Sequence, residues 1–445
     1  MRMYDYDVLY LGSGHGSFDG AGPLAASGQK VGIIESDMIG GTCPNYGCNA
    51  KITLDAPVVL QRLAERMRGV TAGQVMIDWG ALVAHKNDVI APLPAMIGGG
   101  LKKAGADIIQ GHGRLTDAHT IEVDGKPYTA EKIVIATGRR PHRLAIPGDE
   151  LAHDSRAFMD LTTLPQRLAI IGSGYISMEF ATIANAAGAE VTVFMHHDEA
   201  LRGFHQPFVK LVTADMTKRG ITFVPSANVS ALTQEAAGVA VHYGDGKTAI
   251  ADWVLDATGR IPNADNIGLE AAGVDFNSRG IPVDDHLRTN VPNIYASGDV
   301  LDKPQGKLTP TATFESFYLF KLFSGQTSDA IQYPAIPSTV YTSPRIAKVG
   351  ITPEEAKAAP DQYTIVRNHI PDDWYHQTDQ ETMGDSILIF DQTHHLVGAT
   401  EVSAQAEDAI NTLLPAVVFH YDQDQMWQLA HIFPSESAAA WHKIR

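Results

Sequence analysis

Short apolar runs, glycine turns and helix-compatible stretches follow one another in a fixed order at the start of the chain. The apolar run Tyr6–Leu11 leads into the turn Gly12-Ser-Gly-His-Gly-Ser17, then a stretch that can form a helix, and then a second apolar run, Lys30–Glu35. Strand, glycine turn, helix and strand in this order are typical of the opening of a dinucleotide-binding unit. We therefore predict one such unit here.

The same order returns in the middle of the chain. The run Leu168–Ile171 precedes Gly172-Ser-Gly-Tyr-Ile-Ser177, a helical segment to Ala187, and the run Glu190–Phe194. In both copies a serine stands where the third glycine is usual, and a small residue there still allows close helix–strand packing. Glycines let the backbone approach a pyrophosphate, and the helix N-terminus offers free N–H groups. Two copies indicate two nucleotide sites.

Further strands follow each unit. The runs Ile133–Gly138 and Val254–Gly259 both end in Ala-Thr-Gly, each at a comparable distance after its own glycine turn. The run Asn293–Asp299 is another apolar strand, and it ends in an acid. From about Tyr333 mixed strands and helices continue without a glycine turn, which predicts a separate C-terminal domain.

Composition limits the classes of partner and location. A chain of 445 residues, 44% of them hydrophobic, is long enough for two or three domains with their own cores. The formal net charge of −17 disfavours nucleic acid and anionic membrane surfaces as partners. No apolar run reaches the roughly 18 residues of a membrane span, and the start lacks the apolar core of a signal peptide. We expect a cytoplasmic protein with no membrane partner.

The two cysteines of the chain lie five positions apart. They stand in Gly40-Gly-Thr-Cys43-Pro-Asn-Tyr-Gly-Cys48-Asn-Ala-Lys51, and none of the usual zinc spacings accompanies them, so we expect no metal site. With this block and the two glycine turns, the chain resembles the pyridine nucleotide–disulfide oxidoreductases over nearly its whole length. The block matches the family pattern closely, apart from Ala50, where proline is usual.

The resemblance implies an α/β fold with two Rossmann-like domains and a C-terminal α+β dimerisation domain. The implied segments are 1–150 and 263–332 for the FAD domain, 151–262 for the NAD(P)H domain, and 333–445 for the interface of a homodimer. FAD contacts are implied for Gly12, Ser13, Gly14, Glu35, Thr42, Thr137, Gly138 and Asp299. Nicotinamide nucleotide contacts are implied for Gly172, Gly174, Tyr175, Ile176 and Gly259, with Tyr175 as the gate of the pocket. Lys51 and Glu179 stand where the family keeps an ion pair beside the flavin.

The cysteines imply redox chemistry. A thiolate is the attacking species, and a helix N-terminus favours the thiolate. We expect a helix over 54–67, with both cysteines at or just before its start and its first turn distorted near Pro44 and Gly47. By resemblance, Cys48 contacts the flavin and Cys43 attacks the substrate.

The end of the second unit favours NADPH over NADH. An NAD-binding fold usually places an acid after the second strand. Here the chain continues His196-His197-Asp-Glu-Ala-Leu-Arg202, and donor or cationic residues there resemble a pocket for the 2′-phosphate. Asp198 and Glu199 dilute the positive charge.

The C-terminus departs from the family. The usual histidine, which acts as general acid–base with a glutamate five residues later, falls at Phe433, and the glutamate falls at Ala438. His431 and Glu436 are candidate replacements, and a third possibility is that no residue here does acid–base work. The pair His394-His395 and the stretch 372–376 are expected to be surface loop.

Three functions remain open. The first is an NADPH-dependent reductase of a small disulfide, similar to glutathione reductase. In the second, the same electron path reduces an acceptor that needs no protonated leaving group, such as Cu or Hg ions, a quinone or oxygen. The third is a catalytically idle flavin-bound sensor, which the intact dithiol block disfavours.

Overall fold

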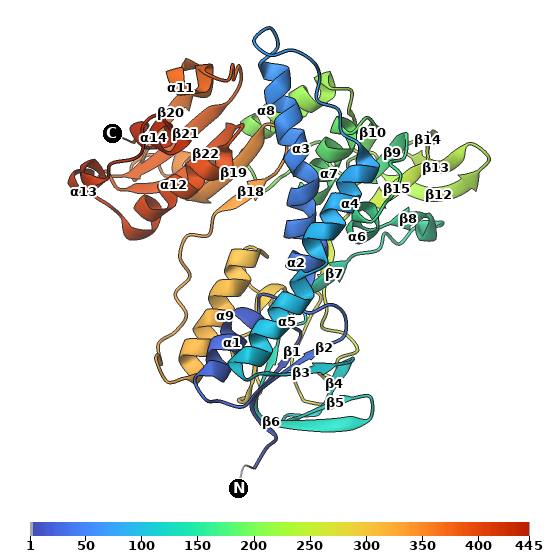
Figure 1. Cartoon of the computed structure of the whole chain (residues 1–445), viewed down its shortest axis with the longest axis vertical. Helices are drawn as coiled ribbons and strands as arrows, with labels where there is room; N and C mark the ends of the chain where they lie inside the picture. Colours follow the sequence, from blue (N-terminus) through green and yellow to red (C-terminus); the bar gives the residue numbers. More distant parts are fainter. Residues whose placement is uncertain (1–2, 445) are drawn as a thin grey trace. The chain divides into compact units, whose positions relative to one another are not determined.

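The computed structural model describes residues 3–444, and these fall into two compact units (Figure 1). Unit 1 contains the residues up to Thr53, Ala84–His142 and Arg260–Tyr333. Unit 2 contains Leu54–Val83, Arg143–Gly259 and the residues from Pro334 onward. Two helices, α3 (Cys48–Arg66) and α4 (Trp79–Ile90), each have residues in both units.

Unit 1 is built on one sheet with the strand order β3-β2-β1-β6-β5-β4, and β17 also pairs with β6. The strands are β1 (Tyr6–Leu11), β2 (Val31–Glu35), β3 (Asp107–Gln110), β4 (Gly113–Asp117), β5 (Thr120–Val123), β6 (Lys126–Ile135) and β17 (Ile294–Ala296). All pairings among β1, β2, β3, β6 and β17 are parallel, whereas β4 and β5 extend the sheet in antiparallel fashion. Parallel strands joined by crossovers place their C-terminal ends at one edge, where ligands bind.

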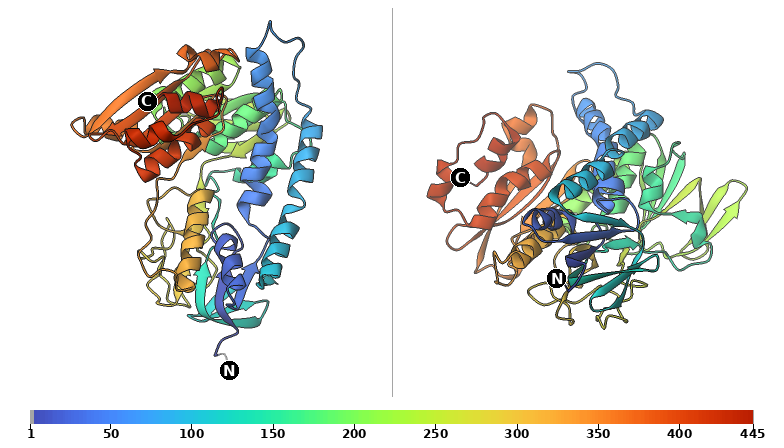
Figure 2. Two further views of the ribbon diagram at one scale, coloured as in Figure 1. Left: turned by 60° about the vertical axis from the view of Figure 1, so that its left-hand side comes forward. Right: turned by 60° about the horizontal axis from the view of Figure 1, so that its bottom comes forward.

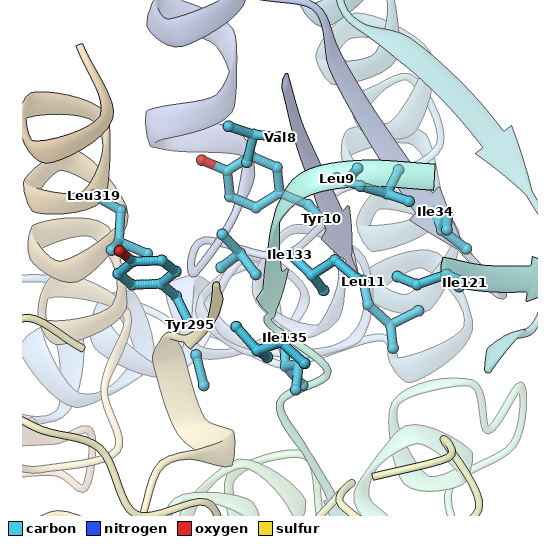
Figure 3. Close-up of a cluster of buried hydrophobic side chains, with 14 of the residues drawn as sticks. Val8, Leu9, Tyr10, Leu11, Ile34, Ile121, Ile133, Ile135, Tyr295 and Leu319 are labelled. Carbon is cyan, nitrogen blue, oxygen red and sulfur yellow. The ribbon is translucent and has the colours of Figure 1, made fainter. Parts of the chain in front are cut away.

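The other elements of unit 1 surround this sheet. They are α1 (Phe18–Ala26), α2 (Thr42–Tyr46), α5 (Leu93–Ala104), η2 (Gly298–Val300), α9 (Thr309–Phe323) and the two-stranded ribbon β7 (Arg139–Pro141) with β16 (Arg260–Pro262). Figure 3 shows side chains of β1, β6, β17 and α9 in the core, with Tyr295 beside Leu319. The parallel strands are apolar on both faces because both faces are covered.

The first part of unit 2 repeats the parallel design. Its five-stranded sheet has the order β11-β10-β9-β15-β8, and all its pairings are parallel. The strands are β8 (Ala152–His153), β9 (Arg167–Ile171), β10 (Glu190–Phe194), β11 (Thr222–Val224) and β15 (Trp253–Asp256). The helices are η1 (Asp149–Leu151), α6 (Ser155–Met159), α7 (Tyr175–Ala186) and α8 (Gln206–Lys218), and an antiparallel sheet adds β12 (Val229–Glu235), β13 (Gly238–Tyr243) and β14 (Lys247–Ala251).

The last part of unit 2 is an antiparallel sheet with the order β18-β19-β22-β21-β20. The strands are β18 (Ser338–Val340), β19 (Arg345–Gly350), β20 (Tyr363–His369), β21 (Asp385–Asp391) and β22 (Leu396–Ser403). The helices are α10 (Pro353–Ala358), η3 (Ile370–Asp372), α11 (Trp374–Gln377), α12 (Ala406–Phe419), α13 (Gln423–Gln428) and α14 (Glu436–His442). Figure 2 shows α12 and α14, in red, together beside the orange strands, and Leu413 and Trp441 join their common core.

The predicted α/β fold with two nucleotide-type units and a C-terminal α+β part is confirmed. The predicted strands of both units agree with β1, β2, β9 and β10 to within one residue. The helix expected over 54–67 was placed too late, because α3 already begins at Cys48, directly after Gly47. Among residues 3–444, no helix combines the length and the apolar character that crossing a membrane requires.

Candidate active site

The first glycine turn closes against a distant strand end. Gly12 has φ +104°, and a Cβ added there would lie 2.4 Å from the carbonyl oxygen of Ala136, in the Ala-Thr-Gly segment after β6. A Cβ added at Gly14 would meet only the carbonyl oxygen of Gly40, at 3.9 Å. Gly12 is therefore required by packing, while Gly14 leaves open space at the start of α1, as close approach of a pyrophosphate needs.

The second turn has the same construction. Gly172 has φ +113°, and an added Cβ would lie 2.4 Å from the carbonyl oxygen of Ala257, in the second Ala-Thr-Gly segment. Nothing lies within 4 Å of a Cβ added at Gly174, which precedes α7. Ser177, at the third position, is buried, and its hydroxyl donates to the carbonyl of Gly172 at 2.8 Å. The repeated Ala-Thr-Gly segments thus serve as the surfaces against which the glycine turns pack.

Glu35 ends β2 beside the first turn. Its carboxylate is buried and accepts hydrogen bonds from the Ser13 N–H at 2.9 Å, the Ser13 hydroxyl at 2.7 Å and the Asp37 N–H at 2.9 Å. An acid at this place in a nucleotide-binding fold suits ribose hydroxyls. The Glu35 carboxylate at the end of β2 and the open space at Gly14 together fit a dinucleotide in unit 1.

The other residues predicted to line the flavin also belong to unit 1. The Thr137 hydroxyl donates to the carbonyl of Asn263 at 2.7 Å, and the carbonyl of Gly138 accepts from the Asn263 N–H at 2.9 Å. These bonds join the two segments of unit 1 that precede and follow residues 143–259. Asp299 lies in η2, 4.0 Å from the Arg260 guanidinium. Thr42 is the first residue of α2. Their contacts with a flavin stay predictions.

The two cysteines lie on two helices separated by one residue. Cys43 belongs to α2, Gly47 interrupts the helix, and Cys48 begins α3. A Cβ added at Gly47 would lie 2.8 Å from the carbonyl of Thr42 and 3.1 Å from Cα of Cys43. Only glycine allows the chain to fold back so closely at this point. A spacing of five residues does not place two side chains together on a regular helix, so the fold-back is what brings the two sulfurs together.

The local electrostatics separate the two thiols. The Cys43 thiol donates a hydrogen bond to the Cys48 sulfur, and this bond is the main reason that the pKa of Cys48 falls to about 6. The Thr309 hydroxyl, 3.5 Å from the Cys48 sulfur, and the charges of Lys51 and His15 lower this pKa further, while burial opposes them. The same hydrogen bond raises the pKa of Cys43. No disulfide joins the two cysteines, so the structure shows the pair as a dithiol.

The residues predicted to bind the nicotinamide nucleotide belong to unit 2. Tyr175 and Ile176 begin α7, and the Tyr175 side chain is about half exposed, at 47%. His196 and His197, with ring centroids 4.5 Å apart, follow β10, and Arg202 is exposed a few residues later. Gly259, with φ +142°, ends the second Ala-Thr-Gly segment. This arrangement leaves the Arg202 guanidinium and two imidazole rings available beyond the second strand.

Glu179, on α7, is buried and accepts a hydrogen bond from the Tyr341 N–H at 2.9 Å. Its predicted partner Lys51 belongs to unit 1, so the ion pair between the two residues stays a prediction.

At the C-terminus, the two candidate acid–base residues have different surroundings. The His431 ring packs on Trp441, with centroids 4.7 Å apart, whereas Phe433 is 61% exposed and lies beside Trp374. Glu436 begins α14 and is buried, with its carboxylate facing His376 rather than solvent. The expectation that the whole stretch 372–376 is surface loop was wrong, because the His376 side chain is only 3% exposed.

Sequence reasoning missed three residues. Thr309 contacts the Cys48 sulfur across 261 positions, and only its place before a helix-compatible run marks it in the sequence. His15 lies inside the first glycine turn, at a position where the motif specifies no residue type. His376 stands between aromatic and polar neighbours, and nothing in its local pattern indicates burial.

Comparison with known proteins agrees with this geometry. The family model described as pyridine nucleotide-disulphide oxidoreductase matches residues 6–316, and the model of its dimerisation domain matches residues 336–443. Glutathione reductase of Nostoc sp. is 33% identical over 432 residues, which cover 93% of this chain and 94% of that protein. The chloroplastic/mitochondrial glutathione reductase of Pisum sativum is 36% identical, covering 80% of this chain and 67% of that protein.

Two further similarities broaden the group. Dihydrolipoyl dehydrogenase of Bacillus subtilis is 32% identical, covering 96% of this chain and 93% of that protein. In fold, the chain is similar to the HOCl-induced flavoprotein disulfide reductase RclA from Escherichia coli, with a TM-score of 0.89, 24% identity and 98% coverage of both chains. With its family model matched over most of its length, the chain belongs to the pyridine nucleotide-disulphide oxidoreductase family.

Proposed function

We propose that this protein is an NADPH-dependent flavoprotein reductase that passes electrons through FAD to the Cys43–Cys48 pair and on to a small disulfide. The observation that carries the proposal is the asymmetry of the dithiol, in which Cys48 has a pKa of about 6 while the Cys43 thiol donates to it. The family is FAD-dependent and uses a pyridine nucleotide, and two glutathione reductases are among the relatives. NADPH is favoured by His196, His197 and Arg202.

Each domain has a proposed part in this scheme. Segments 1–150 and 263–332 would hold FAD, with Gly12, Ser13 and Gly14 facing the pyrophosphate and Glu35 the ribose. Segment 151–262 would hold NADPH at the turn of Gly172 and Gly174. Segment 333–445 would join two copies as a homodimer, which the match to a dimerisation domain supports. We propose a cytoplasmic location, where thiols are kept reduced.

The chemistry of the protein's own residues follows from the dithiol. When bound, FAD would take a hydride equivalent from the nicotinamide and supply the electron pair that reduces the Cys43–Cys48 disulfide. Cys48, with Thr309 and Lys51 favouring its anion, remains a thiolate at neutral pH. Cys43 loses its proton to water and attacks the substrate disulfide, and one substrate sulfur leaves as a thiolate that takes a proton from water. Cys48 then attacks Cys43, which releases the second substrate sulfur and restores the protein disulfide.

A second candidate function rests on Phe433. This residue occupies the family position of the acid–base histidine, and its exposed ring cannot transfer a proton. General acid–base catalysis typically contributes about 10²–10⁴ in rate, so its loss would slow release of a thiolate that must be protonated. An acceptor without such a leaving group, such as a metal ion, a quinone or oxygen, would not suffer this loss.

The test is an anaerobic sample reduced with NADPH, or with NADH for comparison, and then mixed with one acceptor at a time. The panel contains glutathione disulfide, lipoamide, Cu(II), Hg(II), a quinone and oxygen. Fast reoxidation by a disulfide, lost in Cys43→Ser, is the expected result. Fast reoxidation by a metal ion or quinone alone would replace the disulfide proposal by the second candidate. A flavin that NADPH does not reduce would leave only the idle sensor.

A further inference from the structure

A buried cluster of ionisable side chains lies in the C-terminal part of unit 2. Among residues 3–444, three carboxylates, of Glu381, Glu401 and Glu436, share this interior with two basic groups, those of His376 and Lys443. A buried charge is stable only when it is paired or hydrogen-bonded, so the partners of each group decide what the cluster does.

Three of the five groups are paired, and a fourth, His376, is paired at one of its two ring nitrogens. His376 Nδ1 lies 3.0 Å from a Glu381 oxygen, and the other Glu381 oxygen accepts from the Ala404 N–H at 2.6 Å. Glu401, which is fully buried, accepts from the Lys443 ammonium at 3.1 Å and from the Ser403 hydroxyl at 2.8 Å. The Glu381 contact holds the Nδ1 edge of the His376 ring in place, and the Lys443 ammonium compensates the charge of Glu401.

Glu436 is the exception. Its side chain is 8% exposed, and within residues 3–444 neither carboxylate oxygen has a hydrogen-bond partner. Its nearest basic group is the second nitrogen of His376, Nε2, which lies 3.8 Å away and also has no hydrogen-bond partner there. A proton on either atom can be shared between them after a small approach, whereas an ionised Glu436 facing a neutral His376 is an uncompensated buried charge.

The same two segments carry an exposed aromatic pair. Trp374 lies two residues before His376, and Phe433 lies three residues before Glu436. Their rings, 49% and 61% exposed, lie 5.4 Å apart. The two segments are therefore joined twice, by aromatic contact at the surface and by His376 and Glu436 inside.

We propose that His376 and Glu436 share one proton and act as positioning residues, holding the segment of Trp374 and the segment of Phe433 together. Loss of this proton would separate the segments and move the aromatic pair. The inference rests on the proposed function only in taking Phe433 to be part of the acceptor site.

The direction of the pH effect follows from the surroundings. Burial, with Glu401 and Glu381 nearby, raises the pKa of Glu436 from 4.5 to about 7, against the opposing charges of His376 and Lys443. The pKa of His376 is also raised: its own burial opposes this, but Glu381 and Glu436 outweigh that effect. In both cases the folded state binds more protons than the unfolded state. The contribution of Glu436 is complete below its ordinary pKa of 4.5 and is lost as pH rises through about 7, and the contribution of His376 is lost in the same direction.

The test compares the pH dependence of tryptophan emission in the full chain loaded with FAD. The contribution of Trp374 is obtained by subtracting the emission of Trp374→Phe, from about pH 5 to about pH 9. We expect the wild-type difference to change with a midpoint near neutrality. Glu436→Gln keeps the shape of the side chain but cannot ionise, so the change should disappear. The matched control is Asp424→Asn, which removes one exposed charge from α13 of the same domain and should keep the change.

A Glu436→Gln protein that keeps the wild-type transition would overturn the proposal, and so would a wild type without one. If Glu436→Gln does not fold, the wild type decides through its unfolding temperature, which must fall as pH rises through neutrality. A flat or rising profile contradicts the shared proton. None of these readouts uses an acceptor, so failure of the proposed disulfide activity would leave them unchanged.

Discussion

At the scale of single residues, Cys43 and Cys48 differ through one hydrogen bond. The Cys43 thiol is the donor and the Cys48 sulfur the acceptor, so the two residues have opposite pKa shifts although both begin or precede helical turns. The helix N-terminus alone would favour both thiolates. The fold-back at Gly47 makes this hydrogen bond possible, and Thr309, Lys51 and His15 favour the charge on Cys48.

The first prediction concerns this hydrogen bond. In the reduced wild type, alkylation of Cys48 should follow its thiolate, with a midpoint near pH 6. Cys43→Ala removes the donor, and the midpoint should rise by about 1–3 pH units, because Thr309 and Lys51 supply only part of the stabilisation. Rates of iodoacetamide labelling, read at Cys48 by mass spectrometry, measure this shift.

Thr309→Val is the matched control, because it removes a weaker partner of the same sulfur. It should raise the midpoint less than Cys43→Ala does. A larger effect of Thr309→Val would show that the hydroxyl, and not the neighbouring thiol, sets the reactivity of Cys48.

Local motifs predicted the residues whose neighbours are close in sequence. A local sequence motif was enough to predict the positions of Gly12, Gly172 and Glu35, because each motif corresponds to a known backbone geometry. Thr309 and His376 could not be found in this way, because their contacts depend on how distant segments pack. Whether a histidine in a polar stretch such as His376 becomes buried depends on the elements that pack against it in the fold.

At the scale of elements, the two strand–turn–helix units use their glycines for two separate purposes. Gly172 has a positive φ and touches the strand end at Ala257, whereas Gly174 has φ −79° and open space around its Cα. The first meets a requirement of folding, and we propose that the second meets a requirement of nucleotide binding. The motif alone does not separate these two requirements.

The second prediction separates them by mutation. Gly172→Ala should lower the free energy of unfolding by more than about 1–3 kcal/mol, because it combines an unfavourable φ with a clash against backbone atoms. Gly174→Ala should unfold like the wild type but raise the KM for NADPH by about tenfold or more, since its methyl group occupies the approach to the pyrophosphate. Thermal unfolding and steady-state kinetics on both variants test the two statements. An unchanged KM in Gly174→Ala would mean that this turn does not bind the nucleotide.

Element boundaries were predicted less well where the pattern is interrupted. The start of α3 was placed six residues late, because Cys48 to Thr53 has little apolar periodicity. In the structure, the Lys51 N–H bonds to the carbonyl of Gly47 at 2.9 Å, which starts the helix from its first turn. Backbone bonding, and not an apolar face, defines this end of the helix.

At the scale of the whole molecule, the sequence predicted two nucleotide-type units because the pattern occurs twice. It did not predict the antiparallel sheet of the C-terminal domain strand by strand, because short antiparallel strands have weak signals and their order depends on long-range pairing. Recognition of that domain came from the family and not from periodicity.

The third prediction concerns assembly. The match to a dimerisation domain leads us to expect a particle of twice the 47.9 kDa chain mass in sedimentation analysis. If each C-terminal domain completes the partner's acceptor site, turnover per chain should fall on dilution together with the dimer, while reduction of the flavin by NADPH should persist. Full turnover in a monomer would contradict this arrangement.

The position of β17 has a consequence for how the chain is made. This strand pairs with β6 in the first sheet, yet it follows β6 only after residues 143–259, which carry the complete parallel sheet of unit 2. A ribosome therefore releases all strands of the second sheet before the last strand of the first. Because domains generally fold as units during synthesis, unit 2's parallel sheet can form while unit 1 still waits for its final strand. The first sheet to begin is therefore completed after the second one.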